Sequence, residues 1–225
     1  MAVTLGYWHI RGLGQPIRYL CEVGGIKYSE RLYTAKILDD GQVDCSDWLD
    51  EKETLGLDFP NLPYLIDDAS GLKLTQTGTI LEYLARRCDK LGEDPAEQIR
   101  VRMVWDVTCD LRTPYIRACY GGLAHFEATR SMLVEKQLPA ILARLEKYLD
   151  GHEWVAQTKH LTYVDLVVYD LVDQFAVLDE DLLLKPFPNL AAHRDRVAAL
   201  PAMVAYRQSS AFIDRPFNNP FAAFK

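Results

Sequence analysis

The stretch Leu5-Gly6-Tyr7-Trp8-His9-Ile10-Arg11-Gly12 decides how the first part of the chain folds. Val3-Thr4-Leu5 is typical of the start of a buried strand, and the glycines at positions 12 and 14 indicate a turn. Pro16 then suits the first turn of a helix that ends at Gly24-Gly25. This is half of a βαβ unit with a Tyr-Trp pair where the strand ends, and open α/β sheets bind ligands at that edge. From this stretch alone, an ordinary core role for Tyr7 and Trp8 is about as well supported as a functional one.

Length and composition describe a globular protein. Of its 225 residues, 49% are hydrophobic and 25% charged, enough for one large domain or two modest ones. The net charge is −7 and no run of Lys or Arg occurs, which argues against nucleic-acid binding. No stretch reaches the ~18 consecutive apolar residues of a membrane span, so we expect no membrane association. The first strand begins so close to Met1 that we expect no signal peptide.

Cysteine usage indicates reduced thiols and no metal site. The five cysteines are odd in number and scattered, without a Cys-x-x-Cys pair or a Cys/His cluster of zinc-ligand spacing. Reduced thiols are typical of the cytoplasm. They are Cys21, Cys45, Cys88, Cys109 and Cys119.

The first third of the chain alternates strand and helix signals. Residues 35–58 are polar and irregular, with Trp48 and Lys52 on one side of a short helical turn. Pro60 and Pro63 favour extended backbone before the next strand, and Thr77 is expected to cap the helix that follows. The predicted order is β-α-β-α-β-β-α, with the later strands at 28–33, 64–66 and 72–76 and the last helix at 77–88.

After Pro95 only helix signals remain. Pro114 and Pro139 are expected to bend the helices that contain them, and Thr162-x-x-Asp165 has a capping-box layout. We therefore predict an α+β two-domain chain, with one domain at 1–88, a linker at 89–95 and an all-helical domain at 96–225. The predicted helices cover 96–120, 128–149, 162–178, 189–199 and 202–209.

With these elements placed, the chain resembles a cytosolic glutathione transferase, most closely of the mu class. The resemblance covers essentially all 225 residues. It implies a thioredoxin-like βαβαββα domain, an all-helical domain contributing the electrophile pocket, a homodimer, and a cytoplasmic enzyme of detoxification. The motifs are Leu5-Gly6-Tyr7-Trp8-x-Ile10-Arg11-Gly12, Trp48-Leu49-x-Glu51-Lys52, Leu55 to Tyr64, Gln76-Thr77 and Thr162-x-Val164-Asp165.

The resemblance implies that Tyr7 activates the thiol of glutathione for attack on small hydrophobic electrophiles. Lowering a thiol pKa from about 8.5 to about 6.5 requires ~2.7 kcal/mol. One hydrogen bond to a charged acceptor supplies about 1.5–3 kcal/mol, so the hydrogen bond of a single phenol is strong enough for this shift in pKa. Glutathione would be a co-substrate, and no separate cofactor is expected.

The resemblance also implies which residues hold the two substrates. Gln76 and Thr77 match the γ-glutamyl contacts, and Leu62, before a cis-proline, matches the contact to the cysteinyl part. Lys52 would bind the glycine carboxylate, and Asp110 would reach the ammonium in the neighbouring subunit's site. The remaining glutathione-binding positions are Trp8, Leu13, Trp48 and Asn61, and the electrophile pocket would be lined by Ile10, Leu13, Ile116 and Tyr120.

Three positions depart from the mu-class pattern. Cys45 stands where an arginine is usual, so a second cation for the glycine carboxylate is missing. Thr77 replaces a serine but keeps the hydroxyl, and Glu82 stands where the dimer interface commonly has an arginine. Phe59 keeps the position of the aromatic plug that inserts into the partner subunit. None of the five histidines has a recognisable partner in the sequence, so none is given a chemical role.

Two alternatives share this fold. One is a carrier of apolar ligands with little turnover, which an intact Tyr7 argues against. The other is a glutathione-dependent isomerase or peroxidase acting on specialised lipids. Within the transferase reading, Tyr120 could also be a plain core residue, and the Trp48–Lys52 pair a surface feature.

Overall fold

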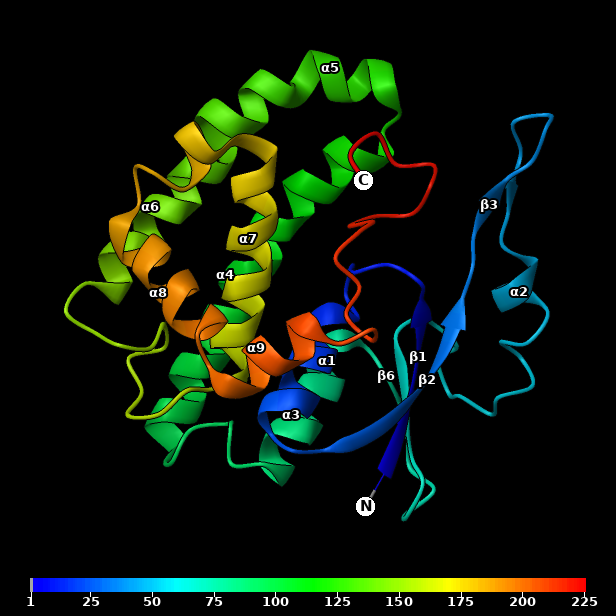
Figure 1. Ribbon diagram of the computed structural model, residues 1–225, viewed down its shortest axis with the longest axis horizontal. Helices are drawn as coiled ribbons and strands as arrows, with labels where there is room; N and C mark the ends of the chain where they lie inside the picture. The colour runs from blue at the N-terminus through cyan, green and yellow to red at the C-terminus, as the bar shows by residue number, and fades with distance from the viewer. Residues whose placement is uncertain (1) are drawn as a thin grey trace.

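The computed structural model describes residues 2–225 and shows a sheet-containing part beside a bundle of helices (Figure 1). The prediction of an α+β chain with a helical second half is confirmed. The first part contains β1 (Ala2–Trp8), α1 (Gln15–Val23), β2 (Lys27–Tyr33), β3 (Lys36–Ile37), β4 (Val43–Asp44), α2 (Ser46–Leu49), β5 (Tyr64–Asp67), β6 (Lys73–Thr75) and α3 (Thr77–Arg87). The second contains α4 (Pro95–Tyr120), α5 (Leu123–Met132), η1 (Leu133–Gln137), α6 (Leu138–Leu149), α7 (Tyr163–Leu183), α8 (Pro188–Ala198) and α9 (Pro201–Gln208).

The four-stranded sheet has the order β2-β1-β5-β6 and places β1 in its interior. β1 runs parallel to β2, and the crossover between them is α1, as a parallel pair requires. β1 runs antiparallel to β5, which pairs with β6 in turn. Val3 and Leu5 of β1 lie in the core that α1 and α3 share. The end of β1 lies in a second cluster, where Tyr7 packs with Trp48 and Tyr64.

Helix α7 is the centre of the helical part (Figure 1). Its residues from Tyr163 to Val172 are all buried, as an apolar helix without a polar face predicts. It contacts α4, α6 and α8 in its own part of the molecule and α1 in the other. The two parts are therefore joined through a continuous apolar core.

The capping box at the start of α7 forms as predicted. Asp165 accepts hydrogen bonds from the Thr162 N–H at 2.8 Å and hydroxyl at 2.9 Å, and from the Val155 N–H at 2.7 Å. The expectation that the histidines lack partners is wrong for two of them. The fully buried His193 places Nε2 3.0 Å from Asp165 Oδ1, and His160 lies 3.1 Å from Glu93. These contacts join elements distant in sequence, which residue spacing does not reveal.

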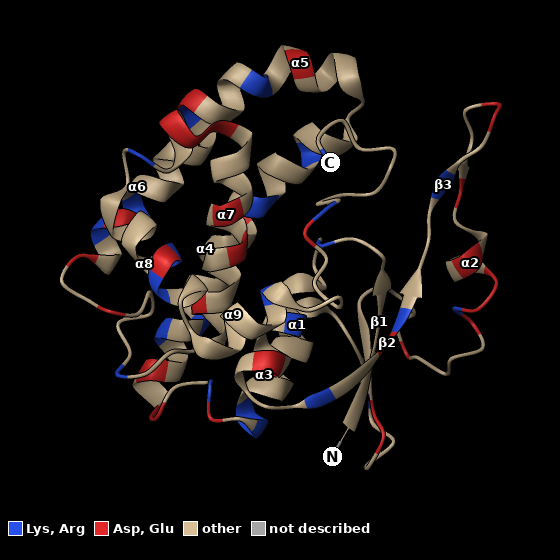
Figure 2. Ribbon diagram, viewed as in Figure 1, with Lys and Arg blue, Asp and Glu red and all other residues tan. Residues whose placement is uncertain are grey.

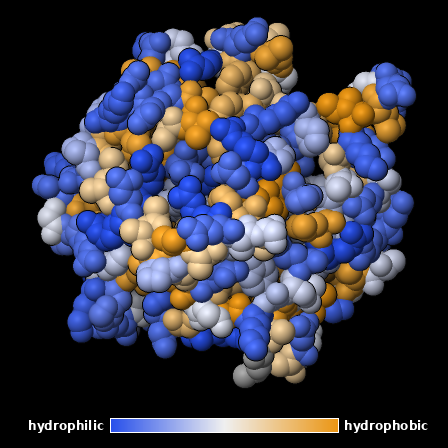
Figure 3. All heavy atoms as spheres, viewed as in Figure 1, coloured by the Kyte–Doolittle hydropathy of each residue, from blue (hydrophilic) through white to orange (hydrophobic). Residues whose placement is uncertain are grey.

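Several boundaries differ from the prediction. The irregular stretch after β2 contains a two-stranded ribbon, β3–β4, that projects from the sheet part, with apolar side chains gathered on it (Figures 1 and 3). The predicted helix at 128–149 begins earlier, at Leu123, and has a π-helical turn just before Pro139. Thr77 does not cap α3, because Gln76 takes that position. Helix α7 continues to Leu183, with Asp179 in a non-helical conformation.

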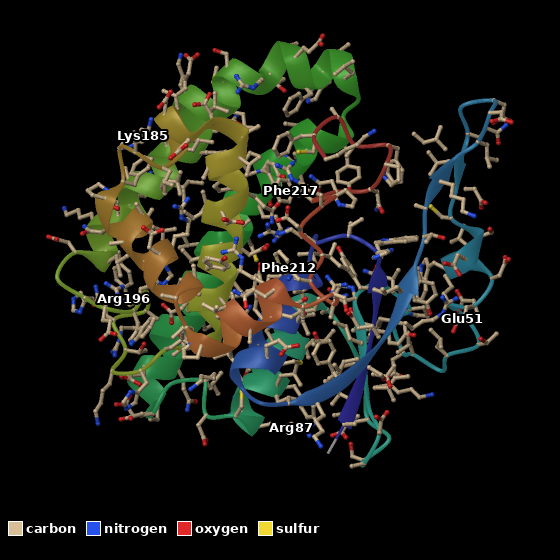
Figure 4. All side chains as sticks on the ribbon, in the orientation of Figure 1. Glu51, Arg87, Lys185, Arg196, Phe212 and Phe217 are labelled. Atoms are coloured by element: carbon tan, nitrogen blue, oxygen red, sulfur yellow. The ribbon has the colours of Figure 1, made fainter. Side chains whose placement is uncertain are left out.

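The C-terminal tail runs back between the two parts of the molecule (Figure 1). The Arg11 N–H donates to the Pro216 carbonyl at 2.9 Å, and the Gly12 N–H donates to the Phe217 carbonyl at 3.0 Å. Phe217 lies near the junction of the helices and the sheet (Figure 4), with the Arg11 guanidinium 5.0 Å from its ring centre. The tail therefore supports the loop after β1.

Residues 2–225 contain neither a helix that could span a membrane nor a side-chain cluster that could hold a metal ion. None of the helices there combines the length and apolar character needed to cross a membrane. Nor does that part of the chain bring together three or more His, Cys, Asp or Glu side chains that could hold a metal ion. All five cysteines are free thiols.

Candidate active site

Tyr7 lies at the end of β1 and is 5% exposed. Its Oη accepts a hydrogen bond of 2.8 Å from the backbone N–H of Leu13, in the loop that follows the strand. Burial raises the Tyr7 pKa, and the Leu13 N–H and the Arg112 charge offset part of that rise. The phenol is therefore protonated at neutral pH and has a proton to donate.

The turn after β1 has glycines where the Tyr7 ring needs room. A Cβ on Gly12 would lie 2.5 Å from Tyr7 Oη, and one on Gly14 would lie 2.6 Å from Tyr7 Cδ1. Gly12 also has a φ of +42°, in the region that favours glycine. The sequence of the turn thus fits the ring that it surrounds.

A cavity of about 530 Å³ opens beside Tyr7, between the β1–α1 loop, helix α4 and the C-terminal tail. It brings together all four residues predicted for the electrophile pocket, Ile10, Leu13, Ile116 and Tyr120. The Tyr120 Oη accepts a hydrogen bond of 2.9 Å from the Asn219 N–H. Burial raises the pKa of Tyr120 to about 12, so this phenol also keeps its proton at neutral pH.

A second cavity, of about 330 Å³, lies at the N-terminus of α3. It is lined by Gln76 and Thr77, the residues predicted for the γ-glutamyl end of glutathione. Gln76 has a φ of 71°, and residues other than glycine that adopt a positive φ are concentrated at functional sites. Leu13, Cys109 and Arg112 line both cavities, so the two adjoin.

The residues predicted for the glycine end of glutathione lie in α2, just after it, and at the end of β1. Trp8 lines the Tyr7 cavity, and Trp48 is buried in a stack on Tyr64, with ring centres 6.1 Å apart. Lys52 is one-third exposed, with its Nζ 3.5 Å from Glu53 Oε1. The cation is thus accessible to a carboxylate ligand.

The segment before β5 has the expected cis bond between Leu62 and Pro63. The Leu62 N–H, however, donates to Asn61 Oδ1 at 2.9 Å. Asn61 is exposed, so its side chain is able to turn away and release this N–H to a peptide ligand.

Asp110 lies apart from the other predicted glutathione contacts. It is exposed on α4 and lines a separate groove between α4 and α6, of about 380 Å³. Within one protomer the structure therefore does not bring Asp110 to Tyr7. Cys45, which departs from the mu-class arginine, precedes α2 and is partly buried.

Several lining residues were not anticipated from the sequence. Arg112 was detectable, because it precedes Ile116 by four residues and Tyr120 by eight, which places all three on one side of α4. Asn218 and Asn219 gave no such signal, because their irregular tail reaches the cavity only through the fold. The other unanticipated residues are Cys109, Thr113 and Arg117.

Known proteins are similar to this chain over almost its whole length. The family model described as "Glutathione S-transferase, N-terminal domain" matches residues 3–86, and that described as "Glutathione S-transferase, C-terminal domain" matches residues 109–210. "Glutathione S-transferase Mu 3" of Homo sapiens is 41% identical over 98% of this chain and 94% of its own. "Glutathione S-transferase 2" of Gallus gallus is 42% identical over 96% of this chain and 94% of its own.

Solved structures show the same architecture. The crystal structure of the glutathione S-transferase Blo t 8 superposes with a TM-score of 0.87 at 30% identity, covering 98% of this chain and 99% of that one. The solved structure of rat hPGDS complexed with a quinoline superposes with a TM-score of 0.76 at 28% identity, covering 92% of this chain and 96% of that one. The chain therefore belongs to the glutathione S-transferase family. Relatives named Mu span nearly all of it, and it is a glutathione transferase of that class.

Proposed function

We propose that the Tyr7 hydroxyl donates a hydrogen bond to the thiolate of glutathione and thereby lowers the pKa of the thiol. The observation that carries this proposal is the bond from the Leu13 N–H to Tyr7 Oη. A phenol oxygen that already accepts a hydrogen bond is disposed to direct its own proton elsewhere. Tyr7 lines the cavity, so a thiolate there is the natural acceptor.

One hydrogen bond from a tyrosine hydroxyl is strong enough to lower the thiol pKa by the amount that this role requires. Thiolate would rise from ~3% to ~75% at pH 7 if the thiol pKa fell from about 8.5 to about 6.5. A more acidic thiol is also a weaker nucleophile, with a Brønsted slope of about 0.4–0.5. The net gain from ionisation is therefore only about threefold, and much of the acceleration must come from holding both substrates together.

We propose that glutathione lies across the end of β1, without a separate cofactor. Its γ-glutamyl carboxylate would bind at Gln76 and Thr77, where the N-terminus of α3 offers N–H groups and a positive dipole end. Its cysteinyl part would pair with the Leu62 backbone, and its glycine carboxylate with Lys52. Trp8, Leu13, Trp48 and Asn61 would complete the contacts.

Electrophiles would enter the cavity beside Tyr7. Ile10, Leu13 and Ile116 offer apolar surface that suits small hydrophobic substrates, in keeping with a detoxifying role. Tyr120 would donate to an oxyanion that develops during the reaction, because its Oη already accepts the Asn219 N–H. The free thiols are consistent with a cytoplasmic location, which we also propose.

Two features favour a homodimer with Phe59 at its interface. Phe59 is 75% exposed, although large apolar side chains are usually buried. The groove between α4 and α6 offers an apolar lining from Met103, Val107 and Leu145. A two-fold dimer would bury one Phe59 in each groove, and Asp110 on the groove wall would approach the partner's site.

The decisive experiment compares the wild type with Tyr7→Phe in conjugation of 1-chloro-2,4-dinitrobenzene. The bound thiolate is followed by its ultraviolet absorbance against pH. Loss of the hydroxyl should raise the bound-thiol pKa by a unit or more. It should lower kcat/KM by at least tenfold, of which lost ionisation accounts for about threefold and lost positioning of the thiolate for the rest. Equal thiol pKa values in the two proteins would contradict the role of Tyr7. Tight glutathione binding with negligible turnover in both would favour a carrier.

A further inference from the structure

The cavity beside Tyr7 has an unusual charge for this protein. The chain carries 32 Asp and Glu residues against 25 Lys and Arg. Nevertheless, two arginines and not one carboxylate line the cavity. Acidic residues lie elsewhere, for example on the loop that joins β3 to β4 and on α2 (Figure 2). The reaction cavity is thus a cationic site in an acidic molecule.

Arg112 is the more buried of the two arginines, with 14% of its side chain exposed. It forms an ion pair with Asp170 at 3.7 Å, a distance that is too long for a hydrogen bond. Asp170 is also engaged elsewhere, since Oδ1 accepts from Arg11 at 2.8 Å and Oδ2 accepts from Gln174 at 2.7 Å. Within residues 2–225, the Arg112 guanidinium makes no hydrogen bond and has its donors available.

Arg117 lies five residues, or about 1.4 helical turns, further along α4 and is exposed. It forms no ion pair within the part of the chain that the structure describes. Thr113 and Ile116 line the cavity between the two arginines, opposite Ile10 and Leu13 of the β1–α1 loop. The cavity therefore combines an apolar interior with guanidinium groups on its α4 side.

We propose that the preferred electrophiles of this enzyme are apolar molecules that carry a carboxylate, which Arg112 binds and Arg117 assists. This inference rests on the proposed function, whose substrate class it narrows. A guanidinium presents a planar fork of donors that matches a carboxylate in a bidentate pair. Arg112 should contribute more than Arg117, because exposed ion pairs are screened by water and salt.

The position of Arg112 also allows the substrate carboxylate to lie near the reacting atoms without a net repulsion of the thiolate. Arg112 lines the γ-glutamyl cavity as well, so it lies near the boundary where the glutathione thiol would meet the electrophile. Its charge reaches Tyr7, where it offsets part of the rise that burial causes in the Tyr7 pKa. A neutral wall would leave a substrate carboxylate unpaired beside a thiolate, and like charges repel.

The test uses two electrophiles that differ in one group, 4-chloro-3-nitrobenzoate and 4-chloro-3-nitrobenzamide. In each, the glutathione sulfur forms a bond to the aromatic carbon, chloride leaves, and the thiol proton passes to water. Each kcat/KM is divided by the rate constant of the uncatalysed reaction, which removes the difference in reactivity. The wild type should favour the carboxylate at least tenfold, and added salt should reduce that preference.

Three variants test which arginine causes the preference for the carboxylate substrate. Arg112→Gln should abolish the preference, because the rate with the carboxylate should fall at least tenfold more than the rate with the amide, and Arg117→Gln should reduce the preference by about threefold. Arg194→Gln, which alters an arginine of α8 paired with its neighbour Asp195, should leave both rates unchanged. A wild type that treats both electrophiles alike would overturn the proposal. So would an Arg112→Gln variant that loses activity equally with both, since the arginine would then act on the thiolate or the fold.

A binding measurement separates this inference from the proposed function. Calorimetry with 3-nitrobenzoate and 3-nitrobenzamide, with and without glutathione, requires no reaction. At least tenfold tighter binding of the benzoate, lost in Arg112→Gln, would support the carboxylate site even if no electrophile were conjugated. Absence of conjugation with 1-chloro-2,4-dinitrobenzene would contradict the proposed function alone. Equal binding of the two probes would contradict the carboxylate site alone.

Discussion

The backbone N–H of Leu13 donates a 2.8 Å hydrogen bond to the hydroxyl oxygen of Tyr7, six residues earlier in the chain. The bond closes the loop after β1 onto the strand that carries Tyr7. It also occupies the phenol oxygen as an acceptor, so the proton of the hydroxyl is left for another partner. The loop that orients Tyr7 is itself supported by the C-terminal tail, through the Arg11 and Gly12 N–H groups.

Gly14→Ala should displace the Tyr7 ring without straining the backbone at position 14. The added Cβ would lie 2.6 Å from Tyr7 Cδ1, and Gly14 has an ordinary helical φ of −75°. We expect the ring to shift, the bound-thiol pKa to rise and kcat/KM to fall by at least tenfold, because a shift of ~1 Å is enough for such losses. Thiolate absorbance and conjugation rates measure both effects.

Gly25→Ala is the matched control for this substitution. Gly25 has a φ of +63° but nothing within 4 Å of an added Cβ. Ala there should cost about 1 kcal/mol of stability through backbone strain and leave the thiol pKa unchanged. If Gly14→Ala behaved like Gly25→Ala in both measurements, the close fit between the turn and the ring would have no functional importance.

Arg11→Met should destabilise the junction of the two parts of the molecule. Arg11 is 1% exposed and binds Asp170 at 2.8 Å and Asp173 at 2.9 Å, both on α7. Removing one partner of a buried pair costs about 3–5 kcal/mol, because the other charge stays buried. Urea unfolding would measure the loss in the free energy of unfolding.

Two further variants interpret that loss. Asp173→Asn should cost no more than about 1 kcal/mol, because Asp173 is 23% exposed and its pairing is screened. Arg11→Met combined with Asp170→Leu should be more stable than Arg11→Met alone, because the double variant no longer holds the fully buried Asp170 carboxylate without its Arg11 partner. A double variant no better than the single one would show that the lost packing of Arg11, including its contact with Phe217, dominates.

Asp67 should make the fold depend on acid pH. At the end of β5 it accepts hydrogen bonds from the Tyr83 hydroxyl and from the Ala69 N–H, and it pairs with Arg87 at 3.1 Å. These contacts, led by that from Tyr83, lower the pKa of Asp67 to about 2. Its unfolded pKa is about 3.9. The stabilisation is therefore fully present above pH ~4 and is lost as the pH falls from about 4 to about 2.

Asp67→Asn tests this contribution directly. The variant should be less stable than the wild type at pH 7, and the difference should shrink between pH 4 and pH 2.5 in urea unfolding. Asp68→Asn, at the exposed neighbouring position, should show a much smaller difference at either pH. A constant difference from pH 7 to pH 2.5 would mean that the Asp67 carboxylate does not titrate with folding.

Hydrophobic patterns and turn residues predicted the elements that carry their own periodicity. The apolar sequence of α7 and the Thr162–Asp165 capping box predicted its burial and its start. The β3–β4 ribbon was missed, because strands of two residues contain no recognisable alternation. The π-helical turn before Pro139 was missed, although the buried Leu133 and Leu138 on its two sides are five residues apart, a wider step than the α-helical period gives.

The site could be predicted where a motif or a helix face brought residues together. The residues Ile10, Leu13, Ile116 and Tyr120 do line one cavity with Tyr7. Contacts made by the tail could not be predicted, since Asn219 and Tyr120 are 99 residues apart and meet through a backbone N–H. The side chains of His193 and Asp165 also meet only through the fold, since they are 28 residues apart on two helices. A backbone donor leaves no trace in the residue types of a sequence.

Phe59→Ser should convert the dimer that we propose into monomers. Burying a Phe side chain is worth about 1.5–3 kcal/mol. A two-fold interface loses two such contacts, or about 3–6 kcal/mol, which corresponds to a rise of about 10²–10⁴-fold in the dissociation constant. Sedimentation velocity over a range of protein concentrations would measure this dissociation constant.

Met103→Glu, in the α4–α6 groove, should have a similar effect, because a charge there would be buried against Phe59. Val204→Ser, at an exposed apolar position of α9, should leave the association unchanged. A Phe59→Ser protein that sediments as the wild type does, while Met103→Glu dissociates, would place the groove at the interface but assign another side chain to it.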